Sequence, residues 1–272
     1  MIQTIIIGKN SNLSLFLKES VTNSILVSSR EIGENINILD AYKDKKINLI
    51  FNNFQPATQL NSTSNSSAYV TNAILSTAQV LDYFKDTHIN KIIYTSSSSV
   101  YGNNILCKEH DELKPMNLHA ALKVANEKLI EKYCIDNTID YTITRIFNMY
   151  GGNDTFSVVS KMLRAYRNKE VLTIVNNGNA IRDFIYIDDV VMIYKKLLDI
   201  KNVKILNIGT GSGNSIKGIL DFLSHNDIKI EVGNIFRDEL KISTSDARLL
   251  NETIGRYYFL GIEEYLSKEL NL

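Results

Sequence analysis

Short apolar runs alternate with longer amphipathic stretches through the first half of the chain. Runs of this kind are typical of strands that are buried on both faces of a sheet. They predict strands at Gln3–Ile7, Ser24–Ser28, Ile36–Leu39, Ile47–Asn52, Lys91–Ser96 and Tyr141–Arg145. Between the strands, helical patterns are clearest at Ala68–Phe84 and at His119–Tyr133, where one face carries Ala121, Val124, Ala125 and Leu129.

The alternation of strands and helices predicts an α/β fold with a doubly wound parallel sheet, as in Rossmann-like proteins. After residue 150 the alternation of strand and helix patterns becomes less regular. The later patterns predict helices at Ser157–Asn168 and from Asp188, a turn at Asn176–Asn179, and strands at Val171–Val175, Arg182–Ile187 and Lys204–Ile208. We therefore expect a dinucleotide-binding core over residues 1–150 and a small α+β substrate lobe over residues 151–272. The segment Arg182–Asn207 is expected to return to the core.

Composition narrows the class of protein. Among 272 residues, 30 basic side chains balance 30 acidic ones, so no overall field favours nucleic acid or an anionic membrane. Two cysteines, Cys107 and Cys134, do not form a disulfide framework and fit a reducing cytoplasm. The apolar runs are far shorter than the ~20 residues of a membrane span, and Ile5–Ile7 begins without a signal-peptide pattern. We expect a cytoplasmic globular protein.

A small-residue turn joins the first strand to the first helix. In Gly8-Lys9-Asn10-Ser11-Asn12-Leu13-Ser14, serines stand where a Gly-x-x-Gly-x-x-Gly pattern would place its later glycines. A dinucleotide pyrophosphate needs a tight turn and free N–H groups at the helix start. The candidate cofactor-binding residues here are Gly8, Asn10, Ser11, Asn12 and Leu13. An ordinary strand–helix turn, capped by Asn12 or Ser14, explains the same pattern.

The ends of the next two predicted strands bear on the choice of cofactor. The second strand runs into Ser28-Ser29-Arg30 without the acidic residue that would bind a ribose 2′-hydroxyl. Ser29 and Arg30 can instead accept a 2′-phosphate, which favours NADP over NAD, although Arg30 is equally compatible with a surface role. Asp40, at the end of the predicted third strand, can accept from the adenine amino group or cap a helix.

A serine-rich strand end and a downstream lysine suggest a redox site. Ser97 lies in Ser96-Ser97-Ser98-Ser99-Val100-Tyr101-Gly102, and Lys123 follows on the predicted helix. With the Gly8 turn and later motifs, the chain resembles the extended short-chain dehydrogenase/reductase superfamily, in particular its nucleotide-sugar epimerase, dehydratase and ketoreductase members. The resemblance runs nearly end to end and includes Glu127, Arg145-x-x-Asn148-x-Tyr150-Gly151 and Gly178-x-x-x-Arg182-Asp183-Phe184-x-x-x-Asp188-Asp189.

The resemblance implies three catalytic residues. Ser97 would hydrogen-bond the reacting sugar oxygen, and Lys123 would bind the nicotinamide ribose and lower the pKa of a neighbouring acid. The expected tyrosine, four residues before Lys123, is replaced by His119. Three alternatives follow: the imidazole relays the proton, Ser97 acts through a water, or the site has lost its chemistry.

Two neighbouring positions narrow the reaction that the resemblance implies. Ser98 and Ser99 stand where family members that eliminate water carry acidic residues, so a 4,6-dehydratase is disfavoured. An epimerase or a keto-sugar reductase remains, and the region from Arg182 to Gly211 is most similar to reductases of polysaccharide precursors. Phe54 stands where relatives place small residues against the cofactor, which departs from the family pattern.

The resemblance also implies a binding site for a nucleotide-diphosphate sugar. Asn148 would contact the substrate near its diphosphate, and Arg182 and Arg237 would bind its phosphates, with Asp246 as a structural partner of Arg237. Asp188 and Asp189 are expected to cap and pack a helix. No metal is implied, and relatives suggest a homodimer through the two long helices. The competing hypothesis is a degenerate relative that binds NAD(P) or a sugar nucleotide as a sensor or partner subunit.

Overall fold

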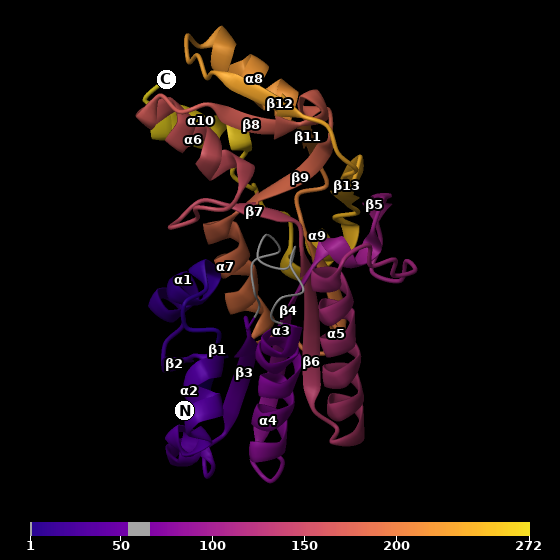
Figure 1. The fold of residues 1–272 in the computed structure, drawn as a ribbon. Coiled ribbons are helices and arrows are strands. Elements are labelled where there is room, and N and C mark those ends of the chain that lie inside the picture. Colours follow the sequence, from indigo (N-terminus) through magenta and orange to yellow (C-terminus); the bar gives the residue numbers. More distant parts are fainter. Residues whose placement is uncertain (1, 54–65) are drawn as a thin grey trace. The chain divides into compact units, whose positions relative to one another are not determined.

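The computed structural model describes residues 2–53 and 66–272, and the chain divides into two compact units (Figure 1). The first unit comprises residues 1–100, 115–145 and 191–206, and the second comprises residues 101–114, 146–190 and 207–272. The chain passes between the units several times, so neither unit is continuous in sequence. Helix α7 (Ile187–Leu197) and strand β10 (Ile205–Ile208) each begin in one unit and end in the other.

A parallel sheet forms the centre of the first unit. Its strand order is β10-β6-β4-β3-β1-β2, and the pairs β1–β2, β1–β3 and β3–β4 are parallel. The strands with their bounds are β1 (Gln3–Ile7), β2 (Ser24–Val27), β3 (Ile47–Phe51), β4 (Ile89–Ser97) and β6 (Asp140–Ile146). This Rossmann-like sheet confirms the predicted fold class. The carboxyl ends of these paired strands meet at one edge of the sheet, where a doubly wound fold binds its ligands.

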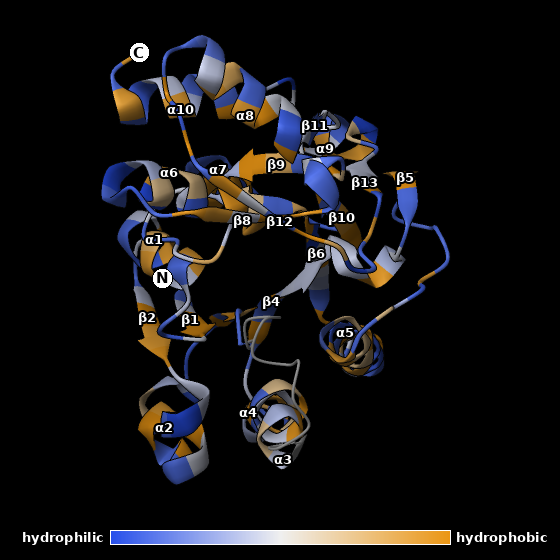
Figure 2. Cartoon of the chain, turned by 45° about the horizontal axis from the view of Figure 1, so that its top comes forward, coloured by the Kyte–Doolittle hydropathy of each residue, from blue (hydrophilic) through white to orange (hydrophobic). Residues whose placement is uncertain are grey.

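Helices cover both faces of this sheet. They are α1 (Asn12–Ser20), α2 (Ser29–Glu34), α3 (Ser66–Val70), α4 (Ser76–Tyr83) and α5 (Leu118–Asp136). Helices α2, α4 and α5 lie on one side and α1 on the other (Figure 2). Strands β1 and β2 are largely coloured hydrophobic in the same view, and Ile5, Ile7, Phe51 and Tyr94 are fully buried in the core. The sheet is therefore buried on both faces, as its short apolar runs predict.

The segment after α2 corrects one predicted strand. Residues Ile36–Tyr42 form a 3₁₀ helix, η1, instead of a strand. The side chain of Asn35 accepts from the N–H of Asn37 and begins this helix. An asparagine whose side chain accepts a hydrogen bond from a backbone N–H two residues later favours a turn over an extended strand. Here this local hydrogen bond outweighs the strand preference of the short apolar run. Asp40 thus lies within the 3₁₀ helix and does not close a strand.

The second unit combines two small sheets with helices. One sheet has the order β11-β9-β13-β5, with β7 paired to β9, and the other pairs β12 with β8. The strands are β5 (Asn104–Cys107), β7 (Asn148–Tyr150), β8 (Leu172–Val175), β9 (Ile181–Tyr186), β11 (Gly213–Ser215), β12 (Val232–Ile235) and β13 (Ile242–Ser245). The helices are α6 (Val158–Asn168), α8 (Ile216–His225), α9 (Arg248–Ile254) and α10 (Ile262–Leu270). Tyr150, Met162 and Leu266 are among its fully buried core residues.

Candidate active site

The turn after β1 has the geometry of a tight phosphate loop. Gly8 has φ +111°, and a Cβ added there would lie 2.5 Å from the main-chain oxygen of Asn52. Only glycine fits such a backbone pressed against the end of β3. Helix α1 begins at Asn12, and its N-cap Ser11 makes no side-chain capping bond. The first-turn N–H groups are therefore not capped by Ser11, which suits an anion at this helix start.

The predicted loop residues are all at this turn. Asn10 is exposed, Asn12 is half-buried, and Leu13 is buried in the core beneath them. The neighbouring Lys9 forms a 2.9 Å ion pair with Glu31 of α2. Glu31 also accepts from the N–H of Ser28, and with the Lys9 ammonium these bonds lower the pKa of Glu31 to about 2. The ion pair therefore connects the turn after β1 to the first turn of α2, which follows β2.

Ser28 and Glu31 form a reciprocal capping box at the start of α2. Ser29 is the first helical residue and Arg30 follows it, exposed to solvent. Asp40 lies elsewhere on the surface, where it accepts from the Tyr83 hydroxyl and pairs with Lys43 at 2.8 Å. The Lys43 ammonium, followed by the Tyr83 hydroxyl, lowers the pKa of the Asp40 carboxyl.

Lys123 is buried against the end of β4. Its Nζ donates to the main-chain oxygen of Thr95 at 2.6 Å and lies 5.0 Å from the centre of the Tyr94 ring. Burial lowers the pKa of Lys123 to about 7, while the negative charge of Glu127 acts in the opposite direction. A lysine that helix α5 pins to the strand end thus exchanges its proton near neutral pH.

A buried ion pair lies one turn beyond Lys123 on the same helix. Arg145 Nη2 donates to Glu127 Oε2 at 2.7 Å, and Arg145 Nε donates to Oε1 at 3.2 Å. Both side chains are almost fully buried, at 3% and 2% exposed. Ser96 Oγ, next to Ser97 in the chain, also donates to Glu127 Oε1. Buried charges are tolerated only when paired and hydrogen-bonded in this way, so the network fixes β4, β6 and α5 to one another.

Buried hydroxyls connect the same strand end to its neighbours in the sheet. Thr95 Oγ1 donates to Asn52 Oδ1, and Asn52 Nδ2 donates to Ser14 Oγ of α1 at 3.1 Å. Tyr194 lies 2.6 Å from both Thr95 Oγ1 and Thr144 Oγ1. This chain of polar side chains joins the phosphate-loop helix to the strand end that holds Lys123.

His119 lies one helical turn before Lys123, near the start of α5. Asn117 begins this helix by accepting from the N–H of Ala120 at 2.9 Å. Burial, together with the positive charge of Lys123, lowers the pKa of His119 to about 4. The half-buried imidazole is therefore neutral at pH 7.

Ser97 ends β4 and is half-buried. Its Oγ accepts from the N–H and from the hydroxyl of Ser99, at 3.2 and 3.0 Å. Ser98 and Ser99 continue into the 3₁₀ helix η4 (Ser98–Tyr101). The first unit therefore brings Lys123 to the Thr95–Ser97 strand end and places His119 beside Lys123. Phe54 lies outside the described residues.

The second unit contains the three predicted substrate residues. Asn148 begins β7, and its Nδ2 donates to the main-chain oxygen of Asp183 at 3.0 Å. Arg182 lies on β9 and is half-buried, whereas Arg237 is exposed in the segment before β13. Asp246, the expected structural partner of Arg237, instead pairs with Arg248, which is only two residues away.

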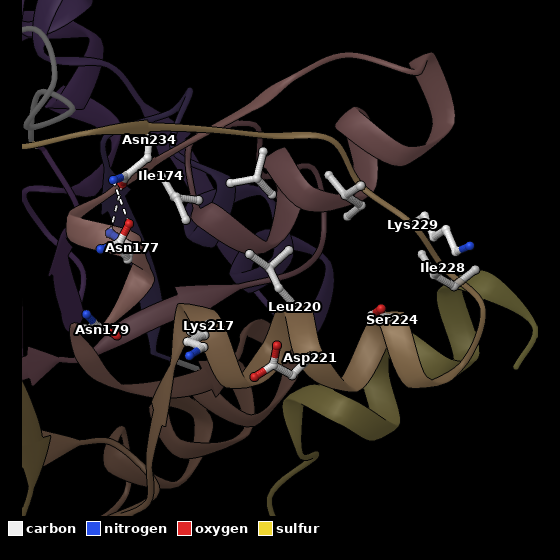
Figure 3. Close-up of a pocket in the computed structure, with 12 residues that line it drawn as sticks. Ile174, Asn177, Asn179, Lys217, Leu220, Asp221, Ser224, Ile228, Lys229 and Asn234 are labelled. Atoms are coloured by element: carbon white, nitrogen blue, oxygen red, sulfur yellow. Dashed lines mark hydrogen bonds between the residues drawn. The ribbon is translucent and has the colours of Figure 1, made fainter.

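The two units contain further features that sequence reasoning did not identify. Asp183 is fully buried and accepts from Thr210, Gly211 and Ser245, at 2.6 to 3.1 Å. It therefore organises the loop after β10. A pocket of about 680 Å³ lies between α8 and the β8–β12 pair, with Ile174, Leu220 and Ile228 among the residues that line it (Figure 3). None of the predicted substrate residues lines this pocket.

The face of α5 that is buried was also not identified. Ala121 and Ala125 are exposed, and Val124 and Leu129 are half-buried. Lys123, Asn126 and Glu127 are buried instead. The apolar pattern did not indicate this face because Lys123, Asn126 and Glu127 interrupt the buried apolar residues Ala120, Ile130 and Cys134. The motif spacing of Lys123 and Glu127, four residues apart, was the available signal.

The described residues do not suggest a metal centre or a membrane span. No group of three or more His, Cys, Asp or Glu side chains within residues 2–53 and 66–272 is arranged to hold a metal ion. None of the helices in those same ranges is both long and apolar enough to cross a bilayer. The polar atoms of the site are instead those of a tight turn, a helix start and a lysine, and these donors fit a dinucleotide.

Comparison with known families agrees with this geometry. The model of the NAD dependent epimerase/dehydratase family matches residues 25–209. The chain belongs to this family. The matched residues include strands β3, β4 and β6 and helix α5, which carries Lys123.

Individual relatives share part of their length with the chain. It is 28% identical over 219 residues to a UDP-glucuronate 4-epimerase of Thermodesulfobacterium geofontis, covering 77% of this chain and 67% of the relative. It is 30% identical over 203 residues to Protein CapI of Staphylococcus aureus, covering 70% and 59%. Across the curated relatives that it matches, the chain spans about half to two thirds of their length.

Solved structures show the same fold. A UDP-glucuronic acid 4-epimerase from Bacillus cereus, in complex with UDP-glucuronic acid and NAD, superposes with a TM-score of 0.84 at 20% identity, covering 100% of this chain and 98% of that one. A similarity at this level of identity supports the fold assignment of the whole chain.

Proposed function

We propose that the protein is an NAD(P)-dependent epimerase or ketoreductase that acts on a nucleotide-diphosphate sugar. The observation that carries this proposal is the buried Lys123, held at the end of β4 with His119 one turn away on α5. Family membership and the names of the relatives support the substrate class. The structure of the first unit supports the cofactor class, because the Gly8 turn and the start of α1 suit a pyrophosphate.

The chain's own residues divide the chemistry between them. A bound NAD(P) would supply reversible hydride transfer to and from a sugar carbon. His119 is a neutral imidazole at pH 7 and so takes the proton from the sugar hydroxyl during oxidation. Ser97 donates a hydrogen bond to the same oxygen, and Lys123 binds the nicotinamide ribose. With a pKa of about 4, His119 is a weaker base than ordinary histidine and its imidazolium is a stronger acid, so proton abstraction is the harder half of the cycle and proton return the easier half.

Residues of both units would hold the two ligands. In the first unit, Gly8, Asn10, Ser11, Asn12 and Leu13 form the pyrophosphate turn. Ser29 and Arg30 would favour NADP over NAD, since neither is acidic and Arg30 is free to meet a phosphate. Asp40 would bind the adenine. In the second unit, Asn148, Arg182 and Arg237 would bind the diphosphate of the sugar nucleotide.

The cellular role and assembly of the protein follow from the same family. We infer a cytoplasmic homodimer that supplies precursors for surface polysaccharides. The two cysteines are buried thiols, which suits a reducing compartment. Helix α5 turns Ala121, Ala125 and the 56% exposed Ile135 outward, which provides a surface for a second copy.

A product assay with the purified protein tests this function. UDP-glucose, UDP-glucuronic acid and UDP-N-acetylglucosamine are each incubated with NAD or NADP, and the sugars are identified by NMR. An epimerase converts the sugar while the absorbance of reduced nicotinamide does not accumulate. A reductase consumes NADPH in proportion to product formed from the corresponding keto sugar.

Variants separate a working enzyme from a binding protein. Lys123→Ala should lower turnover by about 10²–10⁴-fold, and His119→Gln by a similar factor. Lys128→Ala, on the exposed side of α5, is the matched control and should retain the wild-type rate. Binding of NAD(P) and UDP-sugar without turnover, together with activity in His119→Tyr alone, would instead identify a degenerate binding protein.

A further inference from the structure

Arg182, which is proposed to bind the substrate phosphates, already forms an ion pair with Glu239 of the same unit. Arg182 Nη2 lies 3.4 Å from Glu239 Oε2 and also donates to the main-chain oxygen of Leu240. Its Nη1 donates to the main-chain oxygen of Ile181 at 2.9 Å. The side chains of Arg182 and Glu239 are only 16% and 21% exposed, so their attraction is weakly screened by water.

A set of asparagines holds Glu239 in this position. Asn176 Nδ2 donates to Glu239 Oε1 at 3.2 Å and to the main-chain oxygen of Arg237 at 2.7 Å. Asn176 Oδ1 accepts from the N–H of Arg237 at 3.3 Å. Asn176 has φ +47°, a left-handed conformation that asparagine tolerates better than most residues. The turn at Asn176 thus fixes the segment 237–240 from one side.

The neighbouring pair of asparagines extends this attachment. Asn177 and Asn234 exchange two hydrogen bonds, in which Asn177 N donates to Asn234 Oδ1 at 2.8 Å and Asn234 Nδ2 donates to Asn177 Oδ1 at 2.7 Å (Figure 3). Both ends of the segment 234–240 are therefore attached to elements of the second unit. Glu239 is positioned by the fold rather than by a chance side-chain rotamer.

We propose that Glu239 is a positioning residue that competes with the substrate diphosphate for Arg182. This inference rests on the proposed function. A diphosphate needs the forked donors of an arginine, and here Glu239 already takes one of them. Binding must exchange the carboxylate for a phosphate, so Glu239 holds the arginine in place while it weakens nucleotide affinity.

Calorimetric titration with UDP and with uridine tests this competition. Glu239→Gln removes the charge but keeps an oxygen that can accept from Asn176. We expect it to tighten UDP binding by about five- to tenfold, as removal of a nearby competing anion does. Uridine, which has no phosphate, should bind equally to wild type and variant. Asp238→Asn is the matched control, because it removes a fully exposed carboxylate one residue away and should leave UDP affinity within about twofold.

A double-mutant cycle decides whether the gain acts through Arg182. Arg182→Gln should weaken UDP binding by at least tenfold, and adding Glu239→Gln should then restore nothing. An equal gain in both backgrounds would indicate a long-range charge effect and overturn the proposal. So would weaker UDP binding in Glu239→Gln, which would make Glu239 a ligand or a support.

The same titrations separate this inference from the proposed function. If wild type binds UDP, Arg182→Gln weakens that binding and Glu239→Gln leaves it unchanged, only the role of Glu239 is wrong. If neither wild type nor Glu239→Gln binds UDP, the sugar-nucleotide function fails, and the competition fails with it.

Discussion

Helix α5 in the first unit buries polar side chains together with Ala120, Ile130 and Cys134, whereas the buried residues of helix α6 in the second unit are all apolar. Helix α6 buries Val159, Met162 and Leu163, and its polar residues face solvent. Helix α5 buries Lys123, Asn126 and Glu127. An apolar face stabilises a fold without specific partners, whereas each buried polar group needs one. The partners of α5 are the Thr95 carbonyl, the Ala73 carbonyl and Arg145, which places the polar face where a reaction needs it.

The polar residues that α5 buries show how the candidate active site is supported. The groups proposed to react, His119 and Ser97, are half-buried and lie near the accessible edge of the sheet. Behind them, Glu127 and Arg145 are buried and paired. The carboxylate of Glu127 also favours the charged form of Lys123, against the effect of burial. The buried pair therefore acts on the site both as a mechanical support and as a source of charge.

Removing one member of the buried pair should have the largest effect. Glu127→Ala leaves the Arg145 guanidinium buried without its carboxylate, and we expect a loss of about 3–5 kcal/mol in the free energy of unfolding. Urea denaturation measures it. Lys128→Ala is the control, since it removes an exposed side chain that pairs with Glu131 and should cost less than about 1 kcal/mol. A loss for Glu127→Ala no larger than the control would show that the pair does not support the fold.

A cavity in α6 should destabilise the fold without altering the redox site. Met162 is fully buried, and Met162→Ala should cost about 2–5 kcal/mol by the lost burial and the remaining cavity. Because Met162 belongs to the core of the second unit, the pKa of His119 should stay the same below the unfolding transition. A shift in that pKa would mean that the scaffold and the site are not separate.

The acid stability of the fold should depend on His119. Its pKa falls from 6.5 to about 4 on folding, so between these values the unfolded chain binds a proton that the folded protein does not. The free energy of unfolding should therefore rise as the pH increases from 4 to 6.5. Thermal melts of wild type and His119→Gln across this range measure the effect. The variant should show a shallower dependence, and identical slopes would contradict a depressed pKa.

Cofactor choice should show the smallest of these effects. Arg30→Gln removes the proposed contact to a 2′-phosphate, and we expect NADP affinity to fall about tenfold while NAD affinity changes little. Fluorescence titration with both reduced cofactors gives the ratio. Lys268→Gln, also exposed and basic but on α10 of the second unit and paired with Glu264, is the control. Equal losses for both cofactors would assign Arg30 to general attraction and not to selectivity.

The sequence predicted the scaffold better than the site. The spacing of apolar residues along the chain was sufficient to predict strands β1 and β3 and the helix that carries Lys123, because burial of apolar side chains stabilises these elements. This spacing failed at Ile36–Leu39, where the Asn35 side chain begins a 3₁₀ helix. It predicted that α5 is a helix but not which of its faces is buried, because that face combines polar with apolar residues. The partners of Asp183, Glu239 and Lys9 come from distant parts of the chain. Such pairs depend on tertiary structure, which no local pattern contains.

The most direct test of the account is the pH titration of the His119 imidazole by NMR of histidine-labelled protein, assigned by comparison with His119→Gln. The account holds that burial and the Lys123 ammonium keep this side chain neutral at the pH where it would accept a proton. It predicts a titration midpoint near pH 4 in the folded protein. A midpoint at or above the ordinary histidine value of about 6.5 would contradict it.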